Sequence, residues 1–235
     1  MASVTRILCL TNSRKPGGTC FAGRLLVGDG IGAWVRPVGP RESEAVSEFE
    51  QQLPSGSIPR PLDIVDVPIL TTKSHGCQTE NWLIDDSRRW TMVRRATSDE
   101  LASCIESPPS IWLNGHSTRY GYHDEMPQVE ADMLTNSLHL VKVPSIKLRV
   151  FAPGKDFGNL DRRVQGFFVY EGIKYGMRVT DLQIEEEFLN HEDGVYQLGT
   201  SCITVSISEP FRKSNGAVNR YKLIASIIPW MDKED

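Results

Sequence analysis

The chain has 235 residues, a formal net charge of −4 and 40% hydrophobic residues. This composition can form packed cores and argues against a disordered chain. Its apolar runs, such as 223–228, are far shorter than the ~20 residues that a membrane-spanning helix needs, so no membrane partner is expected. The chain turns polar after Leu10, unlike a secretory signal, and a cytoplasmic location is therefore expected.

Short runs rich in β-branched and aromatic residues recur along the chain, with Gly and Pro between them. They predict strands near 5–10, 20–27, 33–38, 63–70, 82–84, 111–113 and 138–143, and then near 147–151, 164–170, 173–179, 194–208 and 220–228. Helices are predicted at 43–53, after Thr97 and after Thr180, the last two from capping-box spacing. Many short strands with few helices predict a mainly β protein of small barrels or sandwiches.

A division into two domains is expected at Val143-Pro144-Ser145. Residues 138–143 are predicted to be a closing strand, and a new series of strands begins after them. The pattern predicts an N-terminal domain, 1–143, and a C-terminal domain, 144–235. Because no long Gly/Ser linker joins them, the two domains are expected to pack together.

The N-terminal segment is basic, although the chain as a whole is acidic. The first 36 residues contain five cationic side chains and one acidic side chain, Asp29, which gives a net charge of +4. The cations are Arg6, Arg14, Lys15, Arg24 and Arg36. Such a cluster suggests a surface for an anion, and nucleic acid is the commonest large one. Gly17-Gly18 would let backbone N–H groups approach a phosphate, while the alternative is an ordinary turn with solvated charges. A second basic stretch spans 142–163.

A polar loop follows the fourth predicted strand. Its candidates for contact with base edges are His75, Gln78, Glu80 and Asn81, because amides and carboxylates can pair with the donors and acceptors of bases. The alternative is that these side chains satisfy local backbone groups. His75 and Glu80 also form the one acid–base pair that an enzyme could use. The five scattered cysteines indicate neither a disulfide framework nor a zinc site, and no cofactor or metal is expected.

Trp112 is the ring best suited to stack on a base, with Asn114 nearby for an edge contact. Tyr120 and Tyr122, in a loop interrupted by glycine, are further candidates for exposed rings. The alternative for each of these rings is a place in a barrel core, where most aromatic residues of small barrels lie.

Seven stretches stand out along nearly the whole chain: CLTNSRK (9–15), CFAGR (20–24), WVRP (34–37), QTEN (78–81), IWLNG (111–115), VTD (179–181) and YKLIA (221–225). In their order and spacing they resemble the dual-OB-domain proteins, a prokaryotic family of two tandem OB-like barrels. The resemblance implies two packed OB-like barrels. It also implies binding of nucleic acid or a nucleotide, with some members of the family suspected in antiviral conflict systems. It assigns no catalytic residue.

The sequence thus predicts a non-catalytic protein that binds nucleic acid or a nucleotide-like anion. Phosphate contacts are expected from Arg14, Lys15, Arg24 and Arg36. Contacts to bases are expected from the 75–81 loop, Trp112 and Asn114. Two alternatives stay open: an adaptor or sensor that docks a partner protein through the acidic helix after Thr180, and an enzyme that acts on a nucleotide or modified base through His75 and Glu80.

Overall fold

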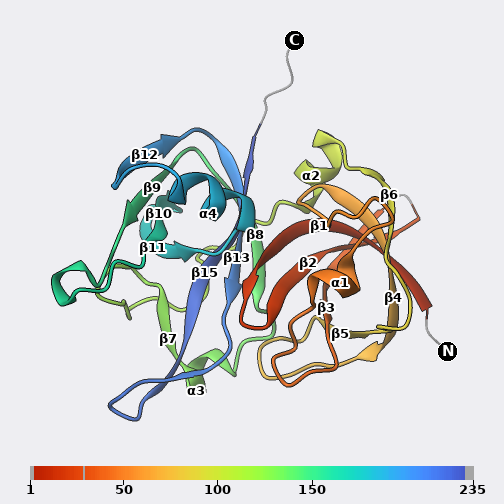
Figure 1. The fold of residues 1–235 in the computed structure, drawn as a ribbon, viewed down its shortest axis with the longest axis horizontal. Coiled ribbons are helices and arrows are strands. Elements are labelled where there is room, and N and C mark those ends of the chain that lie inside the picture. The colour runs from red at the N-terminus through yellow and green to blue at the C-terminus, as the bar shows by residue number, and fades with distance from the viewer. Residues whose placement is uncertain (1–2, 29, 231–235) are drawn as a thin grey trace. The chain divides into compact units, whose positions relative to one another are not determined.

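The computed structural model describes residues 3–28 and 30–230. The chain divides into two compact units, Met1–Ile105 with Leu134–Ser137, and Glu106–Met133 with Leu138–Asp235. Both units consist mainly of β-strands with short helices (Figure 1), which confirms the predicted fold class.

The first unit contains a closed barrel of OB type. Its elements are β1 (Ser3–Lys15), β2 (Gly18–Val27), β3 (Gly30–Val38), α1 (Glu48–Gln51), β4 (Asp63–Thr72), β5 (Asn81–Ile84), β6 (Thr91–Arg95) and α2 (Ser98–Cys104). The strands lie in the order β1-β2-β3-β5-β4, and β4 returns to β1 through the antiparallel register from Ser3↔Ile69 to Leu8↔Ile64. β3 and β5 are parallel. A five-stranded barrel of this kind is an OB-fold.

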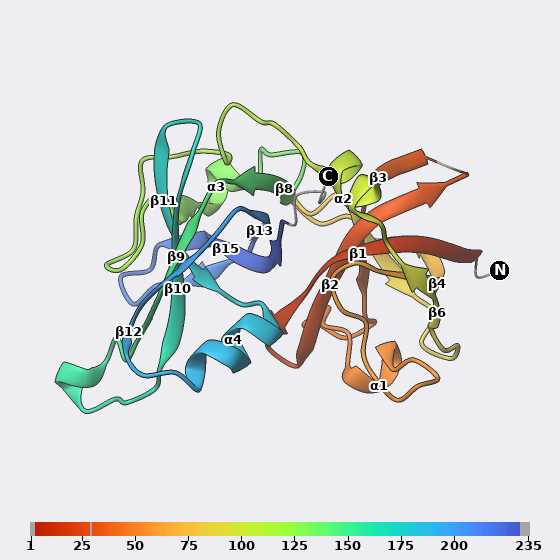
Figure 2. The ribbon, with the colours of Figure 1, turned by 90° about the horizontal axis from the view of Figure 1, so that it is seen from above.

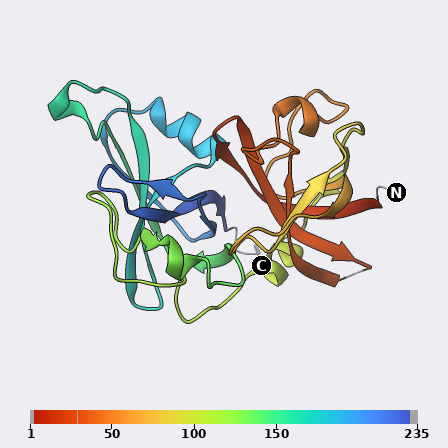
Figure 3. The same cartoon turned by 90° about the horizontal axis from the view of Figure 1, so that it is seen from below.

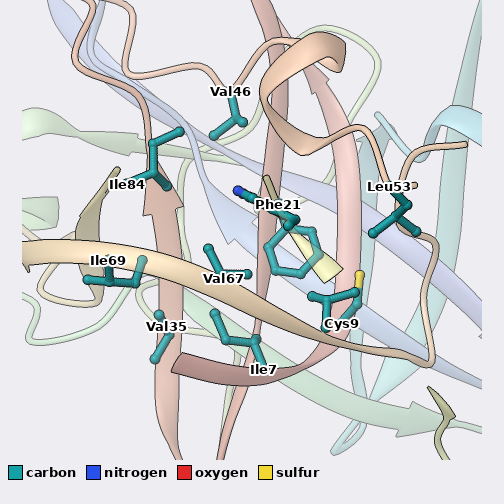
Figure 4. Close-up of a cluster of buried hydrophobic side chains, with 11 residues drawn as sticks. Ile7, Cys9, Phe21, Val35, Val46, Leu53, Val67, Ile69 and Ile84 are labelled. Atoms are coloured by element: carbon teal, nitrogen blue, oxygen red, sulfur yellow. The ribbon is translucent and has the colours of Figure 1, made fainter. Parts of the chain in front are cut away.

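The alternation of side chains along β1 and β2 builds the interior of this barrel. Ile7 and Cys9 of β1 belong to the same buried cluster as Phe21 of β2. Phe21 meets Trp90 edge-on, with 4.9 Å between the ring centroids. Figure 4 shows Val67 of β4 in the same cluster. Each fully buried side chain of this size contributes about 1.5–3 kcal/mol, so the cluster supplies much of the stability of the first unit.

The second unit holds the remaining elements. They are β7 (Glu125–Pro127), α3 (Gln128–Ala131), β8 (Leu138–Val143), β9 (Ile146–Phe151), the 3-10 helix η1 (Lys155–Phe157), β10 (Arg163–Tyr170), β11 (Ile173–Val179), α4 (Leu182–Leu189), β12 (Gly194–Leu198), β13 (Ser201–Ile207), β14 (Phe211–Arg212) and β15 (Val218–Pro229). In Figure 3, η1 lies at the tip of the long connection between β9 and β10.

The second unit has the same OB strand order as the first, except that two of its five strands are each interrupted by a short break. β8 and β9 are separated only by Pro144-Ser145, and β12 and β13 only by a short bend. β12 pairs with β9 and β13 pairs with β8 in one continuous register, from Gly194↔Val150 to Ser206↔Leu138. Each pair of segments therefore acts as one broken strand. The order β8/β9-β10-β11-β15-β12/β13 closes a second barrel, again with one parallel pair, β11 and β15.

The division into compact units differs from the boundary predicted after Val143. β8, predicted to close the first domain, pairs with β13 of the second unit. Leu134–Ser137, immediately before β8, belongs to the first unit, where the Thr79 hydroxyl donates to the carbonyl oxygen of Thr135 at 2.7 Å. The chain therefore passes between the two units more than once.

The helices are shorter than the sequence predicts. The helix expected at 43–53 is confined to α1, which Ser47 caps. The capping box at Thr97 is confirmed at the start of α2. α4 is capped one residue later than predicted, by Asp181, whose carboxylate accepts two backbone N–H groups of the first turn. None of the helices in the described part of the chain is long and apolar enough to cross a membrane.

Candidate functional site

A basic and aromatic surface covers the outer side of β9, β10 and β11 in the second unit. Successive side chains of a strand point to opposite faces, and every second residue here is buried in the barrel: Leu148, Val150, Val164, Phe168, Tyr175 and Met177. The residues between them face outward: Lys147, Arg149, Phe151, Arg163, Gln165, Phe167, Lys174, Gly176 and Arg178. We call this outward set the β9–β11 face; its three strands lie side by side in Figure 2.

The strand register brings residues that are far apart in sequence into one row. Gln165 of β10 is paired with Arg149 of β9 on one side and with Arg178 of β11 on the other. Directly opposite residues of antiparallel strands share a face, so these three side chains form the central row of the β9–β11 face. Arg163 and Phe151 are paired in the next row. Adjacent strands are ~4.8 Å apart, and alternate residues of a strand ~6.7 Å, so one ligand can reach both rows.

These cations have few counter-charges. Among the residues that the structure describes, four of them have no ion pair with a carboxylate: Lys147, Arg149, Arg163 and Lys174. Arg178 has one long contact, 3.8 Å from its guanidinium to Glu185. Burial and the nearby Arg178 lower the pKa of Arg163, and the Nε atom of Arg163 is buried without a hydrogen-bond partner. The face therefore has an excess of positive charge that an anionic ligand would neutralise.

Two aromatic pairs flank the central row. Tyr120 meets Phe151 with 5.2 Å between ring centroids, and the guanidinium carbon of Arg163 lies 5.0 Å from the centre of the Tyr120 ring. On the other side of the row, Tyr122 meets Phe167 at 5.9 Å and is 57% exposed. Of these four rings Tyr122 is exposed, Tyr120 and Phe167 are half-buried and Phe151 is buried. An exposed ring beside cations can stack on a planar ligand while the cations bind anionic groups.

The two tyrosines come from the segment before β7, and this segment is attached to β11. Tyr122 and Gly176 exchange backbone hydrogen bonds of 2.9 and 3.0 Å. A Cβ atom added to Gly176 would lie 2.7 Å from the Phe167 ring and 3.0 Å from the Tyr122 ring. The Tyr120 hydroxyl donates to the carbonyl oxygen of Pro153 at 2.8 Å. Glycine at position 176 therefore leaves the space in which the Tyr122 and Phe167 rings meet.

Two buried side chains hold the beginning of the same segment. The Tyr175 hydroxyl accepts hydrogen bonds from the backbone N–H of Ile111 and from Nδ2 of Asn114, both at 3.1 Å. Lys222 Nζ donates to the carbonyl oxygen of Ile111 at 2.7 Å and to Oδ1 of Asn114 at 3.0 Å. Burial lowers the pKa of Lys222 to about 7. We call Ile111, Asn114, Tyr175 and Lys222 the 111–114 clamp.

The clamp corrects one prediction and places two candidate residues. Residues 111–113, predicted to be a strand, form a bend, because the backbone groups of Ile111 bond to side chains instead of to a neighbouring strand. Asn114 is engaged within the clamp. Trp112 is buried, with 4.7 Å between the centroids of its ring and the His139 ring. Asn114 thus helps to hold the start of the segment that carries Tyr120 and Tyr122, and Trp112 packs inside the second unit.

The N-terminal cations occupy different environments in the first unit. Arg14 is exposed near the end of β1, and Lys15 is half-buried beside it. Arg24 donates from Nε to a backbone carbonyl of β3 at 2.8 Å. Arg36 is only 2% exposed, and its guanidinium lies 3.2 Å from the carboxylate of Glu80. Its burial gives Arg36 a role inside the barrel rather than on a ligand-binding surface.

The Gly17-Gly18 turn also has a packing role. Thr19 and Val46 exchange backbone hydrogen bonds of 2.9 and 3.0 Å beside this turn. A Cβ atom on Gly18 would overlap the carbonyl oxygen of Val46. The close approach that glycine permits at this position is therefore to the chain itself.

The polar loop contributes a buried network to the first unit. Asn81 Oδ1 accepts from Arg36 at 3.3 Å, and Asn81 Nδ2 donates to the amide oxygen of Gln78 at 3.1 Å. The Ser137 hydroxyl donates to Glu80. His75, in contrast, is exposed in the preceding turn. The fold thus gathers Gln78, Glu80 and Asn81 around Arg36, and it places His75 and Glu80 in different environments.

A pocket of about 550 Å³ lies in the first unit, lined by residues of β1, β2, β3, β4, β6 and α2. Its two arginines already have bidentate partners: Arg6 binds Asp66 at 2.8 and 2.9 Å, and Arg94 binds Glu100 at 2.8 and 2.7 Å. The arginines of this pocket are therefore less available to bind an anion than the cations of the β9–β11 face. Within 3–28 and 30–230, no group of His, Cys, Asp and Glu side chains is arranged to hold a metal ion.

The sequence indicates part of the β9–β11 face. The basic stretch 142–163 and the two tyrosines, Tyr120 and Tyr122, both point to it. Sequence reasoning misses Gln165 and Arg178, because only the pairing of β10 with both neighbours brings them beside Arg149. The signal that could have found the face is the alternation of cationic and apolar residues within 147–151.

The comparison with known families agrees with the two barrels. A family model described as the dual OB-containing domain matches residues 5–227. No curated protein matches the chain. The family match and the two OB strand orders together indicate an OB-fold binding module in general terms. The chain belongs to the dual OB-containing domain family.

Proposed function

We propose that this protein binds single-stranded nucleic acid, without catalysis, through the β9–β11 face. The observation that carries the proposal is the set of cations on this face that lack carboxylate partners: Lys147, Arg149, Arg163 and Lys174. Elsewhere the arginines that line the pocket of the first unit are paired. Cations without carboxylate partners, beside the exposed ring of Tyr122, suit a ligand that brings both negative charge and planar groups.

The chemistry of the face matches such a ligand on two counts. The guanidinium groups of Arg149 and Arg178 can donate hydrogen bonds to phosphate oxygens. The rings of Tyr122 and Phe167 can stack on bases, which is worth about 1–3 kcal/mol per base in single-strand binders. The second and third strands of an OB barrel also form the surface that commonly binds oligonucleotides, and β10 and β11 hold those positions here.

The proposal retains only some of the ligand contacts that the sequence predicted in the first unit. Arg14, Lys15 and Arg24 remain predicted phosphate contacts. Arg36, Glu80, Gln78 and Asn81 are assigned to the internal network, so they are not included. The adaptor alternative stays open through the exposed acids of α4, such as Glu186 and Glu187.

The test is the affinity and salt dependence of binding to a labelled single-stranded oligonucleotide of about 12 nucleotides, within the ~4–16 that one OB fold covers. We expect Arg149→Ala to weaken binding, and to reduce the slope of log K against log salt by about 0.7 for each phosphate that the variant no longer binds. Arg88→Ala is the matched control, because it removes one exposed arginine from the first unit.

Equal losses in the two variants, or no binding by the unmodified protein, would overturn the proposal. Co-purification with a protein partner that resists nuclease treatment, together with no oligonucleotide binding, would favour the adaptor instead.

A further inference from the structure

We infer that Gln165 is the specificity-determining residue of the β9–β11 face and that the base it reads is adenine. The inference rests on the proposed function and adds a selectivity to it. Two observations support it: Gln165 lies in the central row, and its side-chain amide forms no hydrogen bond within the described part of the protein.

Gln165 lies at the centre of the face. It is paired with Arg149 on one side and Arg178 on the other, and its neighbours on the same side of β10 are Arg163 and Phe167. These longer or bulkier side chains surround it, and it is 2% exposed. A ligand that displaces the exposed arginine side chains toward its phosphates would therefore meet the Gln165 amide beneath them.

Among the described residues, the side chain of Gln165 forms no hydrogen bond, and neither of its amide atoms is one of the fully buried polar atoms that lack a partner. The amide of this 2% exposed residue therefore keeps a small contact with solvent. The other buried glutamines of the chain do form hydrogen bonds. Gln51 donates to the Thr19 hydroxyl at 2.7 Å, and the amide oxygen of Gln78 accepts from Asn81 at 3.1 Å. An amide that reaches solvent and has no partner in the protein is free to donate and accept hydrogen bonds when a ligand arrives.

The neighbours of Gln165 can only donate. Arginine and lysine side chains carry no acceptor, and Phe167 offers only its ring, so Gln165 supplies the neutral donor–acceptor pair of the central row. A side-chain amide fits adenine in two bonds, since it donates to N7 and accepts from the N6 amino group. The cations can hold any phosphate backbone, whereas this amide distinguishes one base from another.

The experiment compares binding of adenine and thymine homopolymers, each of about 12 nucleotides, to three proteins at one salt concentration. They are the unmodified protein, Gln165→Met and Gln183→Met. Methionine keeps the volume of glutamine and removes its hydrogen bonds, which protects the packing beneath the arginines. Gln183 is exposed on α4 and serves as the matched control.

We expect the unmodified protein and Gln183→Met to bind the adenine polymer at least fivefold more tightly than the thymine polymer, the lower end of the range for a bidentate amide–adenine contact. In Gln165→Met the two affinities should come within twofold of each other. Equal binding of the two polymers by the unmodified protein, or a preference that persists in Gln165→Met, would overturn the inference.

The variant Arg149→Ala distinguishes failure of the adenine selectivity of Gln165 from failure of the proposed nucleic-acid binding. If Arg149→Ala weakens both polymers by a similar factor while no base preference is found, the face binds nucleic acid and Gln165 does not read it. If Arg149→Ala leaves both affinities unchanged, the β9–β11 face is not the binding surface and both proposals fall.

Discussion

Lys222 Nζ lies 2.7 Å from the carbonyl oxygen of Ile111, and Lys222 has no exposed surface. This contact joins β15, in the wall of the second barrel, to the segment that carries Tyr120 and Tyr122. A buried ammonium costs free energy unless its donors are used, and here two oxygen acceptors use them. The rings beside the β9–β11 face therefore depend on an interaction inside the barrel.

Lys222 should make the unfolding of the second unit depend on pH. Its folded-state pKa is about 7, below the 10.5 of an unperturbed lysine. Between about pH 7 and pH 10 the unfolded chain keeps a proton that the folded chain has released, so this group raises the free energy of unfolding as the pH rises. We expect the urea midpoint to rise over this range more in the unmodified protein than in Lys222→Met. Lys155→Met, which removes an exposed lysine, should follow the unmodified profile; parallel profiles for all three proteins would contradict the prediction.

Arg36→Met should destabilise the first unit. The substitution would leave the Glu80 carboxylate buried beside Ser137 without its cation. Breaking a buried ion pair from one side typically costs about 3–5 kcal/mol. We expect a large drop in melting temperature for Arg36→Met and a partial recovery in the double variant Arg36→Met with Glu80→Gln. A stable Arg36→Met protein with weakened oligonucleotide binding would instead assign Arg36 to a ligand site.

Gly176→Ala should weaken binding at the β9–β11 face. The added methyl group would press on the rings of Phe167 and Tyr122 and displace one of them. Overpacking of this kind costs about 1–3 kcal/mol. Gly199→Ala is the control, because a Cβ atom there meets nothing within 4 Å. We expect several-fold weaker oligonucleotide binding and a lower melting temperature for Gly176→Ala alone, and equal behaviour of the two variants would count against the role of the ring pair.

Tyr122→Ala should reduce affinity for single-stranded oligonucleotides without a comparable loss of stability. The Tyr122 ring is 57% exposed, so its removal opens little of the core, whereas stacking on one base is worth about 1–3 kcal/mol of binding. Phe211→Ala, on β14, removes a ring of similar exposure from another part of the second unit. Anisotropy titrations should show weaker binding for Tyr122→Ala only.

The amino-acid sequence by itself indicated most of the longer strands, because the spacing of apolar residues along a strand is a local property that does not depend on the pairing partner. It also identified the cap at Thr97, where the interacting groups are three residues apart. It did not indicate the short strands β6, β7 and β14. It failed at 111–113, because the backbone groups of Ile111 bond to the side chains of Tyr175 and Lys222 from distant strands.

Only the tertiary structure decided which charged side chains are buried and which are exposed. Arg36 and Arg149 both lie in strands, yet Arg36 is buried against Glu80 and Arg149 is exposed beside Gln165. The difference depends on the pairing of strands and on the acids that the fold brings near each guanidinium. Such contacts join residues far apart in the chain, and no local pattern of residues specifies them.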